Sequence, residues 1–233
     1  MSWTAAPLGA FDLETTGPEP LEARIVTACV VPGHTTGTAR PAALNWLLDP
    51  GIDIPDGAAA VHGVTTARAR AEGDNYEDGY RSIRDTLESE WALGHVIAIY
   101  NAAYDLTIIN AEGLRLGYPP LVVGPVIDPF VVDRELDKYR KGKRILAVTC
   151  QHYGVRLDNA HSSDGDSYAT LDLTRAVASR YPGDLERLTS AELMTMQARW
   201  HKARQDDFRA YLQRTGKDAS GVCGEWPLRA VAA

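Results

Sequence analysis

Residues 8–17 read Leu-Gly-Ala-Phe-Asp-Leu-Glu-Thr-Thr-Gly, which combines the alternation of a β-strand with a turn-forming end. Because side chains alternate across a strand, Asp12 and Glu14 project from one face, opposite to the apolar residues beside them. Two neighbouring carboxylates repel each other, and a divalent cation that prefers oxygen ligands, such as Mg²⁺ or Mn²⁺, would neutralise them. An Asp-x-Glu pair on its own is more often an exposed strand face, so other residues must decide between these interpretations.

Further elements follow this strand along the chain. Residues 24–31 and 44–48 are typical of two more strands, and the short turn-rich links predict an antiparallel meander. The apolar run 96–100 predicts a buried strand, and a short one is expected at 122–127. Apolar residues at helical spacing predict helices at 80–91, 106–116, 130–140, 145–153, 165–180 and 184–213. The order of elements predicts an α/β fold with a mixed sheet.

Composition places the chain among globular proteins. It has 233 residues, of which 45% are apolar and 24% charged, so one full core can be buried. No apolar stretch approaches a membrane span, and the N-terminal residues lack the pattern of a secretory signal. Three widely spaced cysteines argue against a disulfide scaffold or a zinc cage. These features predict a cytoplasmic protein.

The net charge of −7 argues against a protein that holds nucleic acid by bulk charge. An enzyme that meets phosphates through bound cations is still compatible with it, and such a site must itself be acidic. The dense basic segment 138–144 is the exception in this acidic chain, and it could contact a phosphate backbone or be a solvated helix end.

Two more aspartates stand at informative places. Asp105 follows the apolar strand 96–100, where helix capping and site formation are both common roles for Asp. Asp166 lies on the apolar stripe of helix 165–180, and a buried charge there is costly unless it is paired or metal-bound. His161 precedes it in a polar loop and could accept a proton, although an exposed loop histidine is the simpler interpretation.

Five segments occur in an order that is more specific than any one of them. They are Phe-Asp-Leu-Glu-Thr-Thr-Gly at 11–17, Val-His-Gly-Val-Thr at 61–65, Asn-Ala-Ala-Tyr-Asp at 101–105, the stretch 144–155, and His-x4-Asp at 161–166. Together they resemble the DEDDh-type family of 3′→5′ exonucleases, which includes the proofreading (epsilon) subunit of bacterial DNA polymerase III and stand-alone relatives. The resemblance covers about residues 7–180.

The chain departs from the usual family pattern at a few positions. Tyr100 stands where the family often has His, and Tyr104 stands where it often has Phe. A sister branch uses Tyr-x3-Asp, and Tyr168 and Asp172 have that spacing. We favour the pair formed by His161 and Asp166, because Asp172 lies on the polar face of the predicted helix.

The resemblance implies a ribonuclease H-like mixed β-sheet flanked by helices, with the first strand central. It predicts an exonuclease domain at 1–182 and a C-terminal helical extension and tail at 183–233. We expect the extension to pack on the core rather than to form a dimer or partner surface.

The resemblance also implies a chemistry. Two divalent cations, Mg²⁺ or Mn²⁺, would be held by Asp12, Glu14, Asp105 and Asp166. His161 would act as general base, and nucleoside 5′-monophosphates would be released. The expected substrate-binding residues are Thr15, Thr16, His62, Asn101 and Tyr104.

The expected partner is a nucleic acid 3′ end, with DNA favoured over RNA and no membrane involved. A polymerase partner and a homodimer both remain open. Two alternatives use the same fold: an enzyme that trims RNA or short oligoribonucleotides, and a non-catalytic module that binds nucleic acid or a polymerase. The intact acidic set favours an enzyme.

Overall fold

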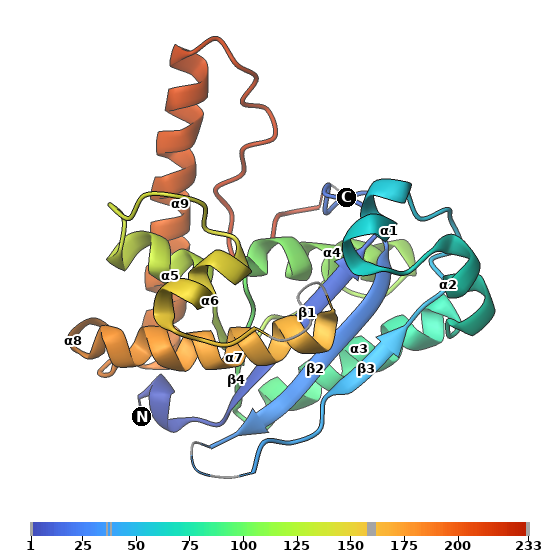
Figure 1. The fold of residues 1–233 in the computed structure, drawn as a ribbon, viewed down its shortest axis with the longest axis horizontal. Coiled ribbons are helices and arrows are strands. Elements are labelled where there is room, and N and C mark those ends of the chain that lie inside the picture. Colours follow the sequence, from blue (N-terminus) through green and yellow to red (C-terminus); the bar gives the residue numbers. More distant parts are fainter. Residues whose placement is uncertain (1, 36, 38, 158–161, 232–233) are drawn as a thin grey trace.

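The computed structural model describes residues 2–35, 37, 39–157 and 162–231. Its centre is a five-stranded sheet with the order β3-β2-β1-β4-β5, so β1 is the middle strand (Figure 1). The strands are β1 (Leu8–Thr15), β2 (Ile25–His34), β3 (Leu44–Leu47), β4 (Val96–Ala98) and β5 (Val126–Ile127). The first three pair antiparallel, whereas β4 is parallel to both β1 and β5. The predicted meander and the mixed α/β sheet are therefore confirmed.

Helices cover both faces of the sheet. They are α1 (Asp56–His62), α2 (Thr66–Glu72), α3 (Tyr76–Ala92), α4 (Ala102–Arg115), α5 (Pro129–Leu136), α6 (Leu146–Tyr153), α7 (Ser163–Arg180), α8 (Pro182–Leu185) and α9 (Ser190–Arg214). A short 3-10 helix, Trp3–Ala5, precedes β1.

The two faces of β1 enter different layers of the core. Phe11 and Leu13 pack in the cluster that also holds residues of α3 and α4, while Ala10 packs with residues of α7. Asp12 and Glu14 alternate with Phe11 and Leu13, so they lie on the same side as α7, and both are partly exposed. Strand alternation thus places the two carboxylates at the boundary between the sheet and α7.

The start of α4 differs from the prediction. The helix begins at Ala102 rather than at 106, because Asn101 adopts a left-handed conformation with φ of 66° and occupies the N-cap position. Asp105 therefore lies inside the first turn and is not a helix cap. This corrects the simpler interpretation of that residue and points its carboxylate to another partner.

Other boundaries also needed correction. The sequence pattern predicts no element between 52 and 75, where the short helices α1 and α2 occur; they bury few residues and show little periodicity. The single helix expected at 184–213 is divided, since Thr189 and Glu192 form a capping box that begins α9. The strands at 96–100 and 122–127 are shorter than expected.

The C-terminal segment packs against the sheet edge. Gln197 of α9 is buried, and its side chain donates to the carbonyl of Val126 and accepts from the amide of Asp128, as a neighbouring strand would. Trp226 is also buried in the main core. The second half of α9 projects away from the sheet (Figure 1). None of the helices in the described ranges is long and apolar enough to cross a membrane.

Candidate active site

Three carboxylates from two elements converge beside β1. Asp12 and Glu14 come from the strand, and Asp166 comes from the first turn of α7. One carboxylate oxygen from each can be chosen so that all three atoms lie within 4.8 Å of one another. Each residue is partly exposed, so the group is accessible from solvent. This is a donor set of hard oxygen atoms, which suits a divalent cation such as Mg²⁺ or Mn²⁺.

Asp105 lies on the other side of the same strand end. It is 4% exposed, and its Oδ1 atom accepts a hydrogen bond from the amide of Leu13 at 3.1 Å. The β1–β4 ladder ends at the pair Ala10 and Ala98, so Leu13 lies beyond the reach of β4. Asp105 therefore satisfies a strand amide and is held next to the three carboxylates.

The four carboxylates oppose one another electrostatically. Burial, and then the charges of Asp105, Asp166 and Glu14, raise the pKa of Asp12 well above its usual value. Burial and the Asp166 charge raise the pKa of Glu14 to about 7. Burial also raises the pKa of Asp105, despite its hydrogen bonds to backbone amides.

No Lys or Arg forms an ion pair with Asp12, Glu14 or Asp105 in the part of the chain that the structure describes. A cation from outside the chain would remove the repulsion, so these residues fit a divalent metal.

The rival pair from the sister branch occupies a different surface. Asp172 forms an ion pair with Arg40 at 2.5 Å, and Tyr168 donates a hydrogen bond to the Pro41 carbonyl at 3.0 Å. Both side chains thus contact the segment after β2. Asp166, and not Asp172, belongs to the group around Asp12.

Two of the expected substrate-binding residues lie together next to this group. The hydroxyl oxygens of Thr15 and Tyr104 are 2.6 Å apart, and both hydroxyls lie within hydrogen-bond reach of the Gly17 carbonyl. His62 is nearby: burial lowers its pKa, while the Thr15 backbone opposes that shift. The Nδ1 atom of His62 accepts from the Val64 amide, which leaves Nε2 as the protonated nitrogen. This Nε2 atom is buried without a hydrogen-bond partner among the described residues.

The other expected residues have different positions. The Thr16 hydroxyl accepts from the Arg24 amide at 2.9 Å, so this side chain closes a turn. The side chain of Asn101 is exposed, and its backbone amide donates a hydrogen bond to the Asp128 carboxylate. His161 lies outside the described residues.

Asp128 is a positioning residue that the sequence patterns did not single out. Its buried carboxylate accepts hydrogen bonds from the amides of Asn101 and Ala102 at 3.0 and 2.9 Å. It also caps α5 and accepts from the Trp226 indole at 3.4 Å. Burial raises its pKa to about 6, although these hydrogen bonds act to lower it. The Asp-Pro dipeptide at 128–129 is a helix-start signal that could have identified it.

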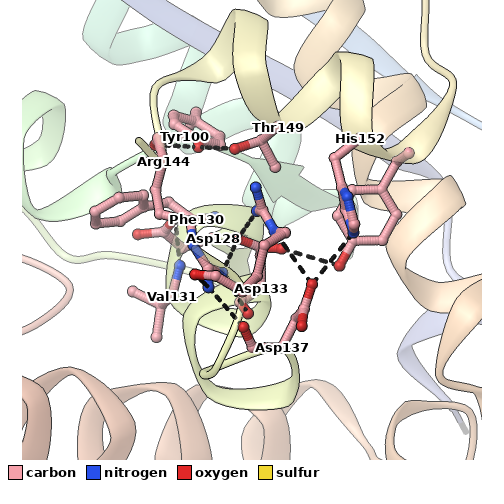
Figure 2. A network of polar contacts seen from close by, with 11 residues as sticks. Tyr100, Asp128, Phe130, Val131, Asp133, Asp137, Arg144, Thr149 and His152 are labelled. Atoms are coloured by element: carbon pink, nitrogen blue, oxygen red, sulfur yellow. Dashed lines mark hydrogen bonds and ion pairs between the residues drawn. The ribbon is translucent and has the colours of Figure 1, made fainter. Parts of the chain in front are cut away.

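The basic segment 138–144 is partly committed to structure. Arg140 and Arg144 each contact the Asp133 carboxylate at 2.6 Å, and Tyr153 donates to it at 2.9 Å. Figure 2 shows this network, which extends through Asp137 to His152. The segment is expected from its sequence to contact a phosphate backbone or to be a solvated helix end. Neither expectation describes Arg140 and Arg144, because both are bound to the buried Asp133.

With this geometry in view, comparisons with known proteins identify the family. The family model of the RNase T exonucleases matches residues 10–174, which is more than half of the chain. The chain therefore belongs to the RNase T exonuclease family, and the resemblance drawn from its motifs is confirmed. Family membership and the acidic cluster together support a metal-dependent nuclease.

Individual relatives agree with this assignment. A DNA polymerase III subunit epsilon-like protein of Rhodobacter capsulatus is 28% identical over 173 residues, which cover 70% of this chain and 22% of the relative. E. coli exonuclease I in complex with a dA16 oligonucleotide superimposes with a TM-score of 0.65 at 20% identity, over 76% of this chain and 42% of that chain. The zinc-bound complex of E. coli exonuclease I with ssDNA gives a TM-score of 0.64 at 21% identity, over 76% of this chain and 41% of that chain.

The fold is thus the ribonuclease H-like exonuclease fold. The chain spans less than half of the length of each of these proteins.

Proposed function

We propose that this chain is a DEDDh-type 3′→5′ exonuclease that hydrolyses nucleic acid to nucleoside 5′-monophosphates. The observation that carries the proposal is the convergence of Asp12, Glu14 and Asp166 within 4.8 Å, with Asp105 held against the same strand. Carboxylates so close together, without an internal cation on Asp12, Glu14 or Asp105 among the described residues, are expected where divalent metal is bound.

Asp12, Glu14, Asp105 and Asp166 would hold two divalent cations. When bound, such cations neutralise charge on the phosphodiester and lower the pKa of a coordinated water. His161 would accept a proton from the attacking water as the water oxygen bonds to phosphorus. The bond between phosphorus and the 3′ oxygen breaks, and the released 3′ oxygen takes a proton from solvent. The Leu13 amide keeps Asp105 oriented, and Asp128 fixes the helix start from which Asp105 projects.

The terminal nucleotide is proposed to lie against Thr15 and Tyr104, whose hydroxyls form one polar wall. His62 supports that wall, since its buried Nε2–H has no partner among the described residues and could donate to the substrate. The proposed substrate is DNA: the similar E. coli exonuclease I structures contain dT13 and dA16 oligonucleotides. Parallel assays with DNA and RNA strands of equal length test this preference.

Label position tests the direction of digestion. With Mg²⁺ or Mn²⁺, a 3′-labelled oligonucleotide should release labelled mononucleotide at once, whereas a 5′-labelled one should shorten progressively. Asp12→Ala and Asp166→Ala should each lower the rate by about 10³-fold or more. Asp172→Ala is the matched control on the same helix and should retain activity, because Asp172 pairs with Arg40. Unchanged activity in the Asp12→Ala protein would refute the proposal.

A polymerase partner and a homodimer remain predictions. The name of the Rhodobacter relative motivates the first. Sedimentation of the purified chain, alone and with a bacterial replicative polymerase subunit, distinguishes a monomer, a dimer and a complex.

A further inference from the structure

A second polar cavity lies away from the acidic cluster, between α5 and α9. Its volume is about 400 Å³, and its wall includes Phe130, Arg134, Lys138, Trp200 and Arg204. The helices that form it lie side by side in Figure 1. The family match ends at residue 174, so the α9 side of this cavity belongs to the segment beyond the family motifs.

Two cations of the cavity, Arg134 and Arg204, form no ion pair with a carboxylate of the described residues. Arg140 and Arg144 also contribute to its wall, but both are bound to Asp133. In contrast, neither Arg134 nor Arg204 forms a hydrogen bond or ion pair with any residue in the described ranges. Two carboxylates, of Glu135 and Asp207, line the same cavity without pairing with these arginines.

Arg134 is the most constrained of these cations. Its guanidinium lies over the Phe130 ring, 4.8 Å from the ring centre, and the side chain is partly buried. Burial, and then the charges of Arg204 and Arg144, lower its pKa. A partly buried guanidinium that faces two others is stabilised by an anion, and its planar donors match the oxygens of a phosphate.

The surroundings favour nucleic acid as the source of that phosphate. Phe130 and Trp200 provide aromatic surface beside the arginines, the combination on which single strands stack. Phe130 also packs edge-to-face on Tyr100, with ring centres 5.5 Å apart. Tyr100 directly precedes Asn101, the cap of the helix that carries Asp105. The cavity is therefore connected by packed side chains to the candidate active site.

We propose that the cavity between α5 and α9 is a second binding site for single-stranded nucleic acid. Arg134 and Arg204 bind a backbone phosphate there while the 3′ end of the same strand occupies the acidic cluster. The inference rests on the proposed exonuclease function and adds a contact through which longer substrates gain affinity.

Binding of fluorescein-labelled dT20 in EDTA measures this contact without hydrolysis. The Arg134→Gln/Arg204→Gln variant should bind about tenfold more weakly. Because each neutralised phosphate contributes about 0.7 to the slope of log affinity against log salt, loss of this one phosphate contact should lower the slope by about 0.7. The control, Arg199→Gln/Arg214→Gln, removes two exposed charges from the same α9 helix and should bind within twofold of wild type. The exposed position of Arg204 makes Arg204→Glu a second variant whose folding should be unaffected.

Kinetics separate this site from the chemistry. With Mn²⁺, the Arg134→Gln/Arg204→Gln variant should show a raised KM for dT20 and an unchanged kcat. Hydrolysis of the p-nitrophenyl ester of thymidine 5′-monophosphate, which is too small to reach both sites, should be unchanged. If wild type fails to hydrolyse this ester, the proposed function fails, while the binding comparison still tests the cavity.

Three results would overturn the second site. The first is equal weakening by the test and control variants, which indicates bulk charge only. The second is unaltered dT20 affinity in both Arg134→Gln/Arg204→Gln and Arg204→Glu. The third is binding of a labelled acidic peptide that depends on the two arginines when dT20 binding does not, which would assign the cavity to a protein partner.

Discussion

Two buried aspartates in this protein have opposite surroundings. The Asp133 side chain is fully buried and contacts Arg140, Arg144 and the Tyr153 hydroxyl (Figure 2). Asp105 is almost as buried, but its carboxylate accepts hydrogen bonds from backbone amides and lies beside other carboxylates. Both sites remove negative charge from water. Among the described residues, arginines balance the charge of Asp133, whereas no Lys or Arg pairs with Asp105.

The difference separates structural carboxylates from candidate ligands. A buried ion pair is complete within the chain, so breaking it is destabilising. A group of carboxylates without an internal cation is destabilising until an external cation binds, and it therefore favours metal binding. Burial alone does not distinguish the two kinds of aspartate, whereas the charge of the neighbours does.

The largest expected effect on stability comes from removing the charge of Asp133, which is paired with two arginines. Asp133→Asn keeps the shape but leaves two partly buried guanidinium groups without their counter-ion, so the free energy of unfolding should fall by about 3–5 kcal/mol. Asp137→Asn is the control: this more exposed partner of Arg140 and His152 should contribute about 0–1 kcal/mol. Urea denaturation measures both, and equal losses would contradict the distinction.

Metal should stabilise the cluster of Asp12, Glu14, Asp105 and Asp166. Mn²⁺ at about 100 times its dissociation constant should raise the free energy of unfolding by about 2.7 kcal/mol. Asp12→Asn and Asp166→Asn should weaken this response, whereas Asp172→Asn should preserve it. Thermal unfolding with and without Mn²⁺ is the measurement, and an equal response in all three variants would place the metal elsewhere.

Without metal, removing one charge from the cluster should stabilise the protein. Asp12→Asn in EDTA should raise the free energy of unfolding by about 1–2 kcal/mol, because it removes a carboxylate charge disfavoured by burial and then by repulsion from Asp105, Asp166 and Glu14. The same variant should be inactive. A loss of stability in urea denaturation would show that Asp12 is satisfied within the chain, as Asp133 is.

The smallest expected effect is a pH dependence of the metal-free protein. The folded-state pKa of Glu14, about 7, is above its ordinary value of 4.5, so the folded state binds more protons than the unfolded state between these values. Stability should therefore fall as pH rises toward 7, by about 1 kcal/mol after allowance for solvent screening of this partly exposed group. Glu14→Gln should remove that share in urea denaturation at several pH values, and a slope of the opposite sign would contradict the cause.

Strong local patterns made much of the fold predictable. The alternation at 8–14 and the turns around the first three strands predicted the meander, which is confirmed. The helices α1 and α2 were not predicted, because they bury few side chains and therefore leave only a weak apolar pattern in the sequence. The early start of α4 was also missed, since it depends on a carboxylate 27 residues later that binds the amide of Asn101.

For the candidate site, the residue types and their order in the chain pointed to the acidic set and to the family. Which carboxylates meet, and which have their own cations, was decided by tertiary structure. Asp166 joins Asp12 while Asp172 joins Arg40, and both arginines of the basic segment pair with Asp133 at the wall of the α5–α9 cavity. The physical reason is that a strand or helix determines locally which face a side chain takes, whereas its electrostatic partner comes from whichever distant element packs against that face.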